Sequence, residues 1–288
     1  MRKYTPIMNL KYKNSKPNLS MFSTENTIVM GILNITNDSF YDGGRYLNEK
    51  QIILRCKTML DEGASIIDIG AQSSKPGAKQ MSSEKELKKL LPIIKLLKNN
   101  FKNIQISIDT FWANTAKESV LAGADIINDI SAGEIDENMF STIAGMDIPY
   151  IMMHMKGTPQ DMQKKPHYNN ITNEITEYFR SKINKLQELG FQKIILDPGF
   201  GFGKTLKHNY QLLNHLENFK QFKLPILVGI SRKSMIYKLL ETKPEHALNG
   251  TSIANTIAIQ NGANILRVHD VKEAVECIKI TKLAKNNL

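Results

Sequence analysis

Cysteine is scarce in this chain, and long hydrophobic runs are missing. The two cysteines, Cys56 and Cys277, lie far apart in apolar helical patterns, so we expect no disulfide framework and a reducing compartment. No apolar stretch approaches the roughly 18 residues of a membrane span, and the basic N-terminus is not followed by the apolar core of a secretory signal. The sequence therefore predicts a cytoplasmic protein with no membrane partner.

Aromatic residues are also few, at 7% of the chain, whereas the formal net charge is +10. Nucleic-acid-binding surfaces usually combine basic residues with aromatic side chains that stack on bases. Here lysines such as Lys85, Lys89 and Lys95 follow an amphipathic pattern, which is typical of a solvated helix face. We expect no nucleic-acid partner, and the positive charge favours an anionic small-molecule substrate.

Eight apolar, β-branched segments alternate with helical patterns. Residues 1–26 show no clear period and are predicted to be an N-terminal extension, while residues 27–288 are predicted to form one domain. Strands that alternate with helices through one chain of 288 residues predict an α/β fold, a TIM (β/α)8 barrel. The expected strands are the apolar run that opens Thr27–Gly44, then Ser65–Gly70, Gln105–Thr110, Asp125–Ser131, Tyr150–Met155, Ile194–Gly199, Pro225–Ser231 and Ile265–Val271.

Local signals mark the ends of the expected helices. Gly63 and Gly190 each follow a helical pattern and suit a helix C-terminus. Ser83 and Glu86 form a capping-box pattern, which predicts that their side chains satisfy backbone groups at the start of a helix.

Polar residues gather where the strands end, which is the face that carries the active site in such barrels. Asp109, Asn128 and Asp197 suit the N–H edge of a nitrogen heterocycle, because a carboxylate accepts two parallel N–H bonds. We therefore predict a pocket that holds a polar heterocycle deep inside and a phosphate nearer its mouth. The loops after the seventh and eighth strands supply the groups expected to bind that phosphate: Ser231, Arg232, Lys233, Arg267 and His269.

Two further motifs do not fit their usual functions. Residues 199–205, GFGFGKT, resemble a phosphate-binding loop, but Pro198 stands where that motif requires glycine, and the segment follows a sixth strand rather than a first. The first strand end has no His-x-His pair of a metal-dependent hydrolase. His154 lies among methionines, so we expect a histidine in the pocket wall rather than a metal ligand.

Seven motifs in order resemble those of the dihydropteroate synthases of the bacterial folate pathway. They are MGILNITNDSFYDGG, DIGAQSSKPGA, SIDT, INDI, ILDPGFGFGKT, VGISRKS and LRVHDV. The resemblance covers about residues 27–272 and uses nearly every strand end. It implies a TIM barrel that joins p-aminobenzoate to (7,8-dihydropterin-6-yl)methyl diphosphate and releases pyrophosphate. It also implies Mg²⁺ as cofactor, a homodimer and inhibition by sulfonamides.

The resemblance also assigns roles to residues. It implies pterin contacts from Asp109, Asn128, Met153, Asp197, Phe202, Lys233 and Arg267. It implies diphosphate contacts from Asn34 through Mg²⁺, and from Asp42, Ser74, Lys75, Arg267 and His269. It implies p-aminobenzoate contacts from Phe40, Ser74, Pro76, Lys233 and Ser234. Catalytic roles fall to Asp42, Asp109, Asp197, Lys233 and Arg267, in an SN1-like substitution that needs no side-chain nucleophile.

Two departures from the family pattern affect the expected loops. Asn37 stands where the first loop commonly has proline, and Lys75 offers a point charge where a forked guanidinium is usual.

Two other functions stay open. One alternative is a methyltetrahydrofolate-dependent methyltransferase that docks a corrinoid protein. The other is a pterin-binding paralogue without catalytic activity.

Overall fold

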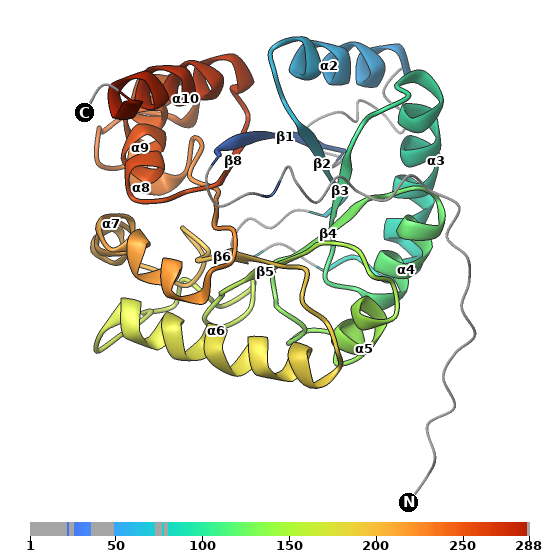
Figure 1. Ribbon diagram of the computed structural model, residues 1–288, viewed down its shortest axis with the longest axis horizontal. Coiled ribbons are helices and arrows are strands. Elements are labelled where there is room, and N and C mark those ends of the chain that lie inside the picture. The colour runs from blue at the N-terminus through green and yellow to red at the C-terminus, as the bar shows by residue number, and fades with distance from the viewer. Residues whose placement is uncertain (1–21, 23–25, 36–48, 73–76, 78–79, 287–288) are drawn as a thin grey trace, which may run out of the picture.

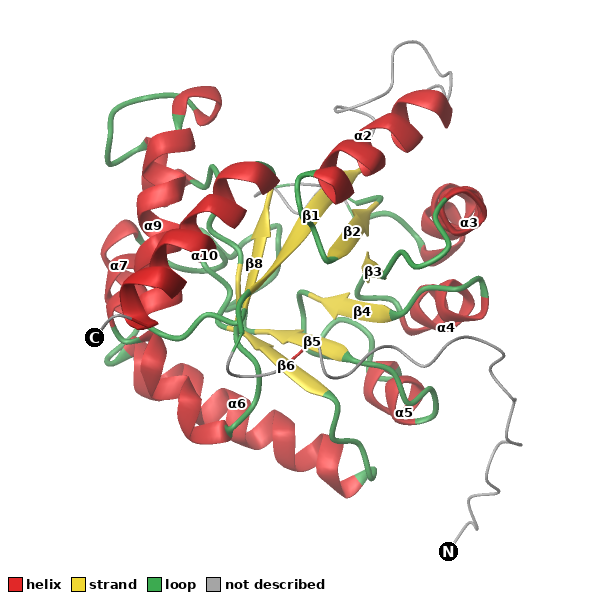
Figure 2. Ribbon diagram, turned by 45° about the horizontal axis from the view of Figure 1, so that its top comes forward, coloured by secondary structure: helices red, strands yellow, loops and turns green. Residues whose placement is uncertain are grey.

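Eight parallel strands form a barrel surrounded by helices (Figure 1 and Figure 2). The computed structural model describes residues 22, 26–35, 49–72, 77 and 80–286. The strands are β1 (Ile28–Asn34), β2 (Ile66–Gly70), β3 (Ile106–Asp109), β4 (Ile126–Asp129), β5 (Tyr150–Met153), β6 (Ile194–Asp197), β7 (Leu227–Val228) and β8 (Ile265–Val268). They pair in the order β6-β5-β4-β3-β2-β1-β8-β7, and a parallel bridge between Leu196 and Ile226 joins the two ends of this sheet.

Helices follow the strands and cover the outside of the barrel, as Figure 2 shows. They are α2 (Glu49–Asp61), α3 (Ser83–Asn100), α4 (Ala113–Leu121), α5 (Met139–Ala144), α6 (Ile171–Glu188), α7 (Leu206–Asn214), α8 (Ser234–Tyr237), α9 (Leu248–Gln260) and α10 (Val271–Asn286). The predicted TIM barrel is confirmed. Within the described residues, no helix is both long and apolar enough to cross a bilayer.

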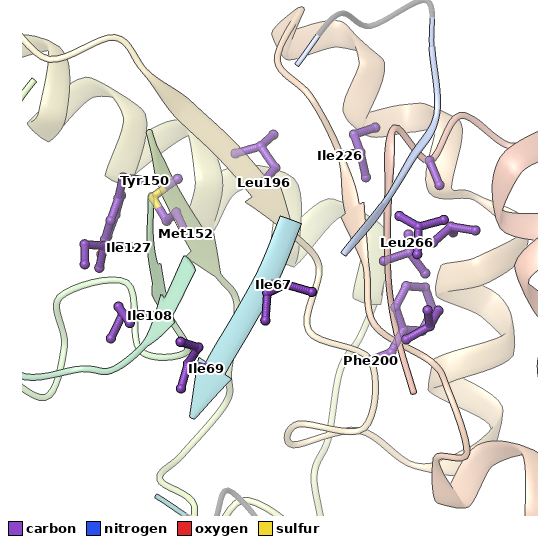
Figure 3. Close-up of a cluster of buried hydrophobic side chains, with 14 of the residues drawn as sticks. Ile67, Ile69, Ile108, Ile127, Tyr150, Met152, Leu196, Phe200, Ile226 and Leu266 are labelled. Atoms are coloured by element: carbon purple, nitrogen blue, oxygen red, sulfur yellow. The ribbon is translucent and has the colours of Figure 1, made fainter. Parts of the chain in front are cut away.

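Successive strand residues point alternately into the barrel and out toward the helices. The outward residues, among them Ile67, Ile108 and Leu266, pack with the helices in the large core cluster of Figure 3. The inward residues near the strand starts form a second apolar cluster, which fills the bottom of the barrel: Met30, Ile66, Ile126, Ile151, Ile195, Leu227 and Ile265. Phe22 packs against this inner cluster, so the chain already touches the barrel before its first strand.

Several strands end earlier than predicted because polar side chains bind the next backbone amides. Asp129 accepts hydrogen bonds from the amides of Ser131 at 2.7 Å and Gly133 at 2.8 Å. Asp197 accepts one from the Gly199 amide at 2.7 Å. The chain therefore turns at β4 and β6 instead of extending the ladder.

The capping-box prediction is wrong. Helix α3 begins after Ser82, whose side chain makes no capping hydrogen bond, and Glu86 lies fully buried. The Glu86 carboxylate accepts hydrogen bonds from Thr110 Oγ1 at 2.6 Å and from Gln72 Nε2 at 2.8 Å. These partners lie outside the helix, so tertiary hydrogen bonds replace the local cap.

Candidate active site

A polar layer lies directly above the apolar bottom of the barrel. It arises because the inward position two residues further along several strands carries a polar side chain. Ile66 is followed by Asp68 on β2, Ile126 by Asn128 on β4, Ile195 by Asp197 on β6, and Ile265 by Arg267 on β8. The structure therefore brings four strands together at one polar site near their C-terminal ends.

Arg267 lies at the centre of this layer and contacts two carboxylates. Its Nε atom donates to Asp68 Oδ2 at 2.7 Å, and its Nη2 atom donates to Asp109 Oδ2 at 2.9 Å. Asn128 Nδ2 also donates to Asp68, at 3.3 Å to Oδ2. The polar groups of β2, β3, β4 and β8 thus form one hydrogen-bonded network.

Burial makes two carboxylates of the site, those of Asp109 and Asp197, costly to ionise. Desolvation raises the pKa of Asp109 to about 7, although the positive charge of Arg267 opposes the rise. Desolvation also raises the pKa of Asp197, opposed by the charge of Lys233. A ligand that offers N–H donors to these carboxylates would favour their ionised forms.

Lys233 lies beside Asp197 and Arg267. Burial lowers the pKa of Lys233 to about 8, and the nearby charge of Asp197 opposes this fall. Its Nζ atom donates to the carbonyl oxygen of Phe200 and lies 4.6 Å from the centre of the Phe202 ring. Gly229 lies beside both side chains, since a Cβ atom there would be in van der Waals contact with Arg267, at 3.8 Å, and with Lys233 Nζ, at 4.0 Å.

An apolar wall borders the same site. Met153 belongs to a buried cluster with Phe111, Ile130 and Met155, and Phe202 packs against this cluster. The structure therefore brings together the two residues predicted to wall the pterin pocket.

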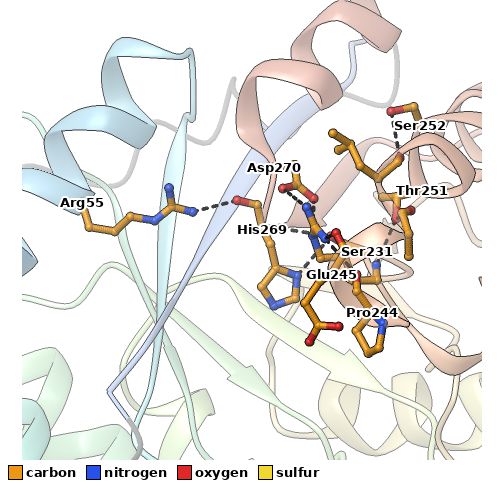
Figure 4. A network of polar contacts seen from close by, with 11 residues as sticks. Arg55, Ser231, Pro244, Glu245, Thr251, Ser252, His269 and Asp270 are labelled. Carbon is orange, nitrogen blue, oxygen red and sulfur yellow. Dashed lines mark hydrogen bonds and ion pairs between the residues drawn. The ribbon is translucent and has the colours of Figure 1, made fainter. Parts of the chain in front are cut away.

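His269 lies just past β8, in the polar network of Figure 4. The Ser231 hydroxyl accepts from the His269 backbone amide at 3.2 Å and lies 3.1 Å from His269 Nδ1. When the hydroxyl donates to Nδ1, the ring carries its proton on Nε2, which is then a hydrogen-bond donor. Burial lowers the pKa of His269 to about 4, so the ring is neutral at pH 7. Arg55 of α2 donates to the His269 carbonyl at 2.8 Å and fixes this corner further.

Arg232 does not take the phosphate-binding role that its position in the sequence predicts. Its guanidinium forms two hydrogen bonds with the Asp270 carboxylate, at 2.8 and 2.9 Å, and two more with the carbonyl oxygens of Pro244 and Glu245 (Figure 4). The residue has a φ of 53°, which turns the chain between β7 and α8. Arg232 therefore has a structural role: it connects the turn after β7 to Asp270 and to the backbone at Pro244 and Glu245.

Asn34 ends β1 at the edge of the polar layer. A Cβ atom placed on Gly70 would lie 3.5 Å from both Asn34 Oδ1 and Asp109 Oδ2, so the glycine leaves a space lined by oxygens. Mg²⁺ often binds through one or two protein oxygens together with substrate phosphates and water, and this arrangement fits that pattern. Among the described residues, no group of three or more His, Cys, Asp or Glu side chains could hold a metal ion.

The remaining predicted residues divide into two groups. Ser234 lies at the start of α8, next to Lys233, and is half-buried. The other five lie outside the described residues: Phe40, Asp42, Ser74, Lys75 and Pro76.

Asp68 is a site residue that the sequence reasoning missed. It is fully buried and contacts both Arg267 and Asn128. A signal was present, because an acidic residue in the middle of the apolar run SIIDIG needs a partner in the folded state. His154, in contrast, is buried as a structural residue and stacks edge-on against Tyr178, with 4.8 Å between ring centres.

The fold and the site together define a (β/α)8-barrel enzyme with a charged, hydrogen-bonding pocket at its strand ends. A profile of the family described as pterin binding enzyme matches residues 30–269. The dihydropteroate synthase of Escherichia coli strain K12 is 42% identical over 264 residues, which cover 90% of this chain and 93% of that protein.

Two solved structures show the same similarity. The dihydropteroate synthase of Yersinia pestis with a sulfonamide drug aligns with a TM-score of 0.86 and 41% identity, over 92% of this chain and 96% of that chain. The dihydropteroate synthase of Clostridium difficile with pteroic acid aligns with a TM-score of 0.85 and 38% identity, over 91% and 98%. The chain therefore belongs to the pterin-binding enzyme family. Its relatives are dihydropteroate synthases, which are transferases of folate synthesis, and they confirm the predicted activity.

Proposed function

We propose that the polar layer binds (7,8-dihydropterin-6-yl)methyl diphosphate and that the enzyme joins its methylene carbon to the amino group of p-aminobenzoate. The observation that carries this proposal is the position of Arg267 between two carboxylates, with Asn128 in the same network. Asp109 and Asp197 accept hydrogen bonds from the N–H groups of the pterin, and Lys233 donates to it. Met153 and Phe202 enclose its flat faces.

The diphosphate binds nearer the mouth of the barrel. Arg267 and the Nε2–H group of His269 donate to its oxygens, and Asn34 would hold a Mg²⁺ ion beside it. The ion would supply Lewis-acid stabilisation of the negative charge on the leaving group. Asp42 and the loop residues Ser74 and Lys75 complete this subsite in the proposal.

The reaction is an SN1-like substitution. The bond between the methylene carbon and the diphosphate oxygen breaks, and its electron pair leaves with pyrophosphate. The dihydropterin ring delocalises the positive charge that remains on the methylene carbon, and the ionised forms of Asp109 and Asp197 stabilise it. The amino nitrogen of p-aminobenzoate then forms the new bond and loses a proton, which gives 7,8-dihydropteroate.

The p-aminobenzoate subsite adjoins Lys233 and Ser234 at the start of α8. In the proposal the Ser234 hydroxyl and backbone bind the carboxylate of the substrate, while Phe40, Pro76 and the Lys233 stem enclose its ring. Sulfonamides compete for this subsite because they present a similar aromatic amine.

We also propose that the enzyme is a cytoplasmic homodimer. Four apolar side chains lie exposed on α9 and on the segment after α8, with exposed fractions of 52% for Leu239, 52% for Leu240, 55% for Ile253 and 37% for Ile257. Gly250 of α9 packs closely against Leu240, so the two segments form one surface. Light scattering should give the mass of a dimer for the wild type and that of a monomer for Ile253→Lys.

Pyrophosphate release tests the proposed reaction. The purified enzyme is given the pterin diphosphate and Mg²⁺, with and without p-aminobenzoate, and dihydropteroate is measured in parallel. We expect release coupled to formation of dihydropteroate, and loss of both when EDTA removes the metal. Tight pterin binding without release in any condition would instead favour the methyltransferase or the non-catalytic alternative.

A further inference from the structure

Lys204 is a buried lysine that the proposed reaction does not use. It follows the glycine-rich residues 199–203, in the segment that resembles a phosphate-binding loop, yet only 3% of it is exposed. Its Nζ atom donates to the carbonyl oxygens of Gly199 at 2.8 Å and Phe202 at 3.0 Å. It also lies 3.0 Å from His154 Nδ1. The carbonyl oxygen of His154, at 3.4 Å, is a further acceptor, so protein groups surround Nζ and leave none of its protons for a phosphate.

The neutral state of the His154 ring supports this geometry. Burial holds the pKa of His154 well below its ordinary value, and the charges of Lys204 and Lys156 lower it further, so the ring is neutral and can accept at Nδ1. Burial also holds the pKa of Lys204 well below its usual range, while the charge of Asp197 favours the ammonium form. The charge of Lys204 in turn lowers the pKa of Asp197, against the larger rise that burial causes.

The segment that Lys204 binds carries groups of the candidate active site. Phe202 faces Lys233 Nζ at 4.6 Å, the carbonyl of Phe200 accepts from Lys233, and the Gly199 amide donates to Asp197. The glycines permit this path: a side chain on Gly199 would overlap the carbonyl oxygen of His154. Because Gly199, Gly201 and Gly203 have no side chains to pack, the path of the segment depends on what binds its backbone groups.

We propose that Lys204 is a positioning residue for the pterin pocket. Its ammonium group binds the carbonyls of Gly199 and Phe202 and the ring of His154, and so fixes Phe202 and Lys233 in their binding positions before the substrate arrives. Such preorganisation raises affinity because the ordering cost is met during folding rather than during binding. The inference rests on the proposed pterin-binding function.

The test compares Lys204→Met with Lys207→Met. Methionine keeps an unbranched stem of similar length but donates no hydrogen bond, and Lys207 is an exposed lysine three residues further on. Titration with (7,8-dihydropterin-6-yl)methyl diphosphate and Mg²⁺ gives both the active fraction and the Kd. We expect Lys204→Met to raise the Kd about tenfold, with kcat at saturation changed less than about threefold, because binding geometry is lost rather than chemistry. Lys207→Met should match the wild type.

A purely structural role predicts a different result. In that case Lys204→Met would lower the active fraction, while the molecules that remain folded would bind with the wild-type Kd; this would overturn the inference. A wild type that does not bind the pterin diphosphate would instead contradict the proposed function.

Amide hydrogen exchange of the wild type decides the question if Lys204→Met does not fold. We expect the amides of Gly199, Gly201 and Phe202, which donate hydrogen bonds within the protein, to be protected in the free enzyme and to change little when the pterin diphosphate binds. Rapid exchange in the free enzyme that becomes slow only with ligand would overturn the inference, because the segment would then be ordered by the substrate and not by Lys204.

Discussion

Arg267 of β8 and Asp68 of β2 form a buried ion pair, with 2.7 Å between Nη2 and Oδ2. The two strands are not neighbours, since β1 lies between them, so the pair spans the inside of the barrel. Asp109 contacts the same guanidinium from a third strand. Arg267 is thus held in place by two carboxylates, one of which, Asp68, is not exposed to solvent at all.

Asp68→Asn should weaken both the fold and the reaction. Removing one partner of a buried ion pair costs about 3 kcal/mol or more of the free energy of unfolding, because the other charge stays buried. Loss of the orientation of Arg267 should lower kcat/KM for the pterin diphosphate by about a hundredfold. Urea unfolding and steady-state kinetics measure the two effects. Asp61→Asn, which breaks an exposed pair with Lys57, is the matched control and should leave the free energy of unfolding and kcat/KM unchanged. If Asp68→Asn behaved like this control, Asp68 would not orient Arg267.

Asp197→Asn should lower turnover severely and leave the fold intact. The amide keeps the shape of the side chain, and its oxygen can still accept from the Gly199 amide, so thermal unfolding should stay near that of the wild type. It cannot accept two N–H bonds from the pterin or stabilise positive charge, so the rate should fall about a hundredfold or more. A folded variant with a near-normal rate would remove the basis for placing the pterin beside Asp197.

Pterin affinity should be greatest between about pH 7 and pH 8. Below pH 7 the carboxyl of Asp109 holds a proton, since its pKa is raised to about 7, and that proton must leave before two N–H donors can bind. Above pH 8 Lys233 loses its charge, since its pKa is lowered to about 8. Binding can be measured by calorimetric titration with (7,8-dihydropterin-6-yl)methanol, which has no titrating phosphate. As the pH rises toward 7, the Kd should fall by up to about tenfold per pH unit, and as the pH rises beyond 8, the Kd should increase again. A Kd that is constant from pH 6 to pH 9 would contradict this assignment.

Glu86→Gln should destabilise the protein, whereas Glu84→Gln should not. Both residues lie in the first turn of α3, but Glu84 is exposed and Glu86 accepts hydrogen bonds from Thr110 and Gln72. An amide supplies one acceptor atom where the carboxylate supplies two, so one buried partner loses its hydrogen bond, at a cost of about 1–3 kcal/mol. Urea unfolding of the two variants measures the difference, and equal midpoints would contradict the role of Glu86.

The pH dependence of the same variant gives a second measurement. Burial raises the pKa of Glu86, so the folded protein keeps a proton that the unfolded chain has released. This contribution to stability is present at low pH and is lost as the pH rises toward the folded pKa. This dependence of the free energy of unfolding on pH should be absent in Glu86→Gln.

The fold and much of the pocket could be predicted from the sequence because they depend on local patterns. Strand-length apolar segments alternating with helical patterns specify a (β/α)8 barrel, and strand ends of such a barrel converge on one face. Asp109 and Asp197 end their strands and Asn128 is the last residue but one of β4, so the pattern predicts all three at this face. Arg267 and His269 followed from the position of the eighth strand.

The errors arose where distant contacts decide the role of a side chain. Glu86 has a local capping pattern, but its partners lie 14 and 24 residues away, and only the packing of α3 against the barrel reveals them. Arg232 and Lys233 are adjacent in the sequence, yet the left-handed backbone of Arg232 sends its guanidinium to Asp270. Such outcomes depend on tertiary geometry that neither periodicity nor motif spacing contains.

Gly199 and Gly190 offer a matched test of close packing beside the pocket. Both have a positive φ, 72° and 78°, so replacement by alanine brings a similar backbone cost of about 1 kcal/mol at each position. Their surroundings differ, because a Cβ atom on Gly190 would meet nothing within 4 Å whereas one on Gly199 would overlap the carbonyl oxygen of His154. Gly190→Ala should therefore lower the free energy of unfolding by about 1 kcal/mol, and Gly199→Ala by about 3 kcal/mol or more, since β5 and the segment after β6 must separate. Pterin binding should also fall only in Gly199→Ala, because this segment carries Phe202. If the two variants were equally destabilised in urea, β5 would be able to move away from the added methyl group without loss of stability. Glycine would then be needed at position 199 only for its positive φ.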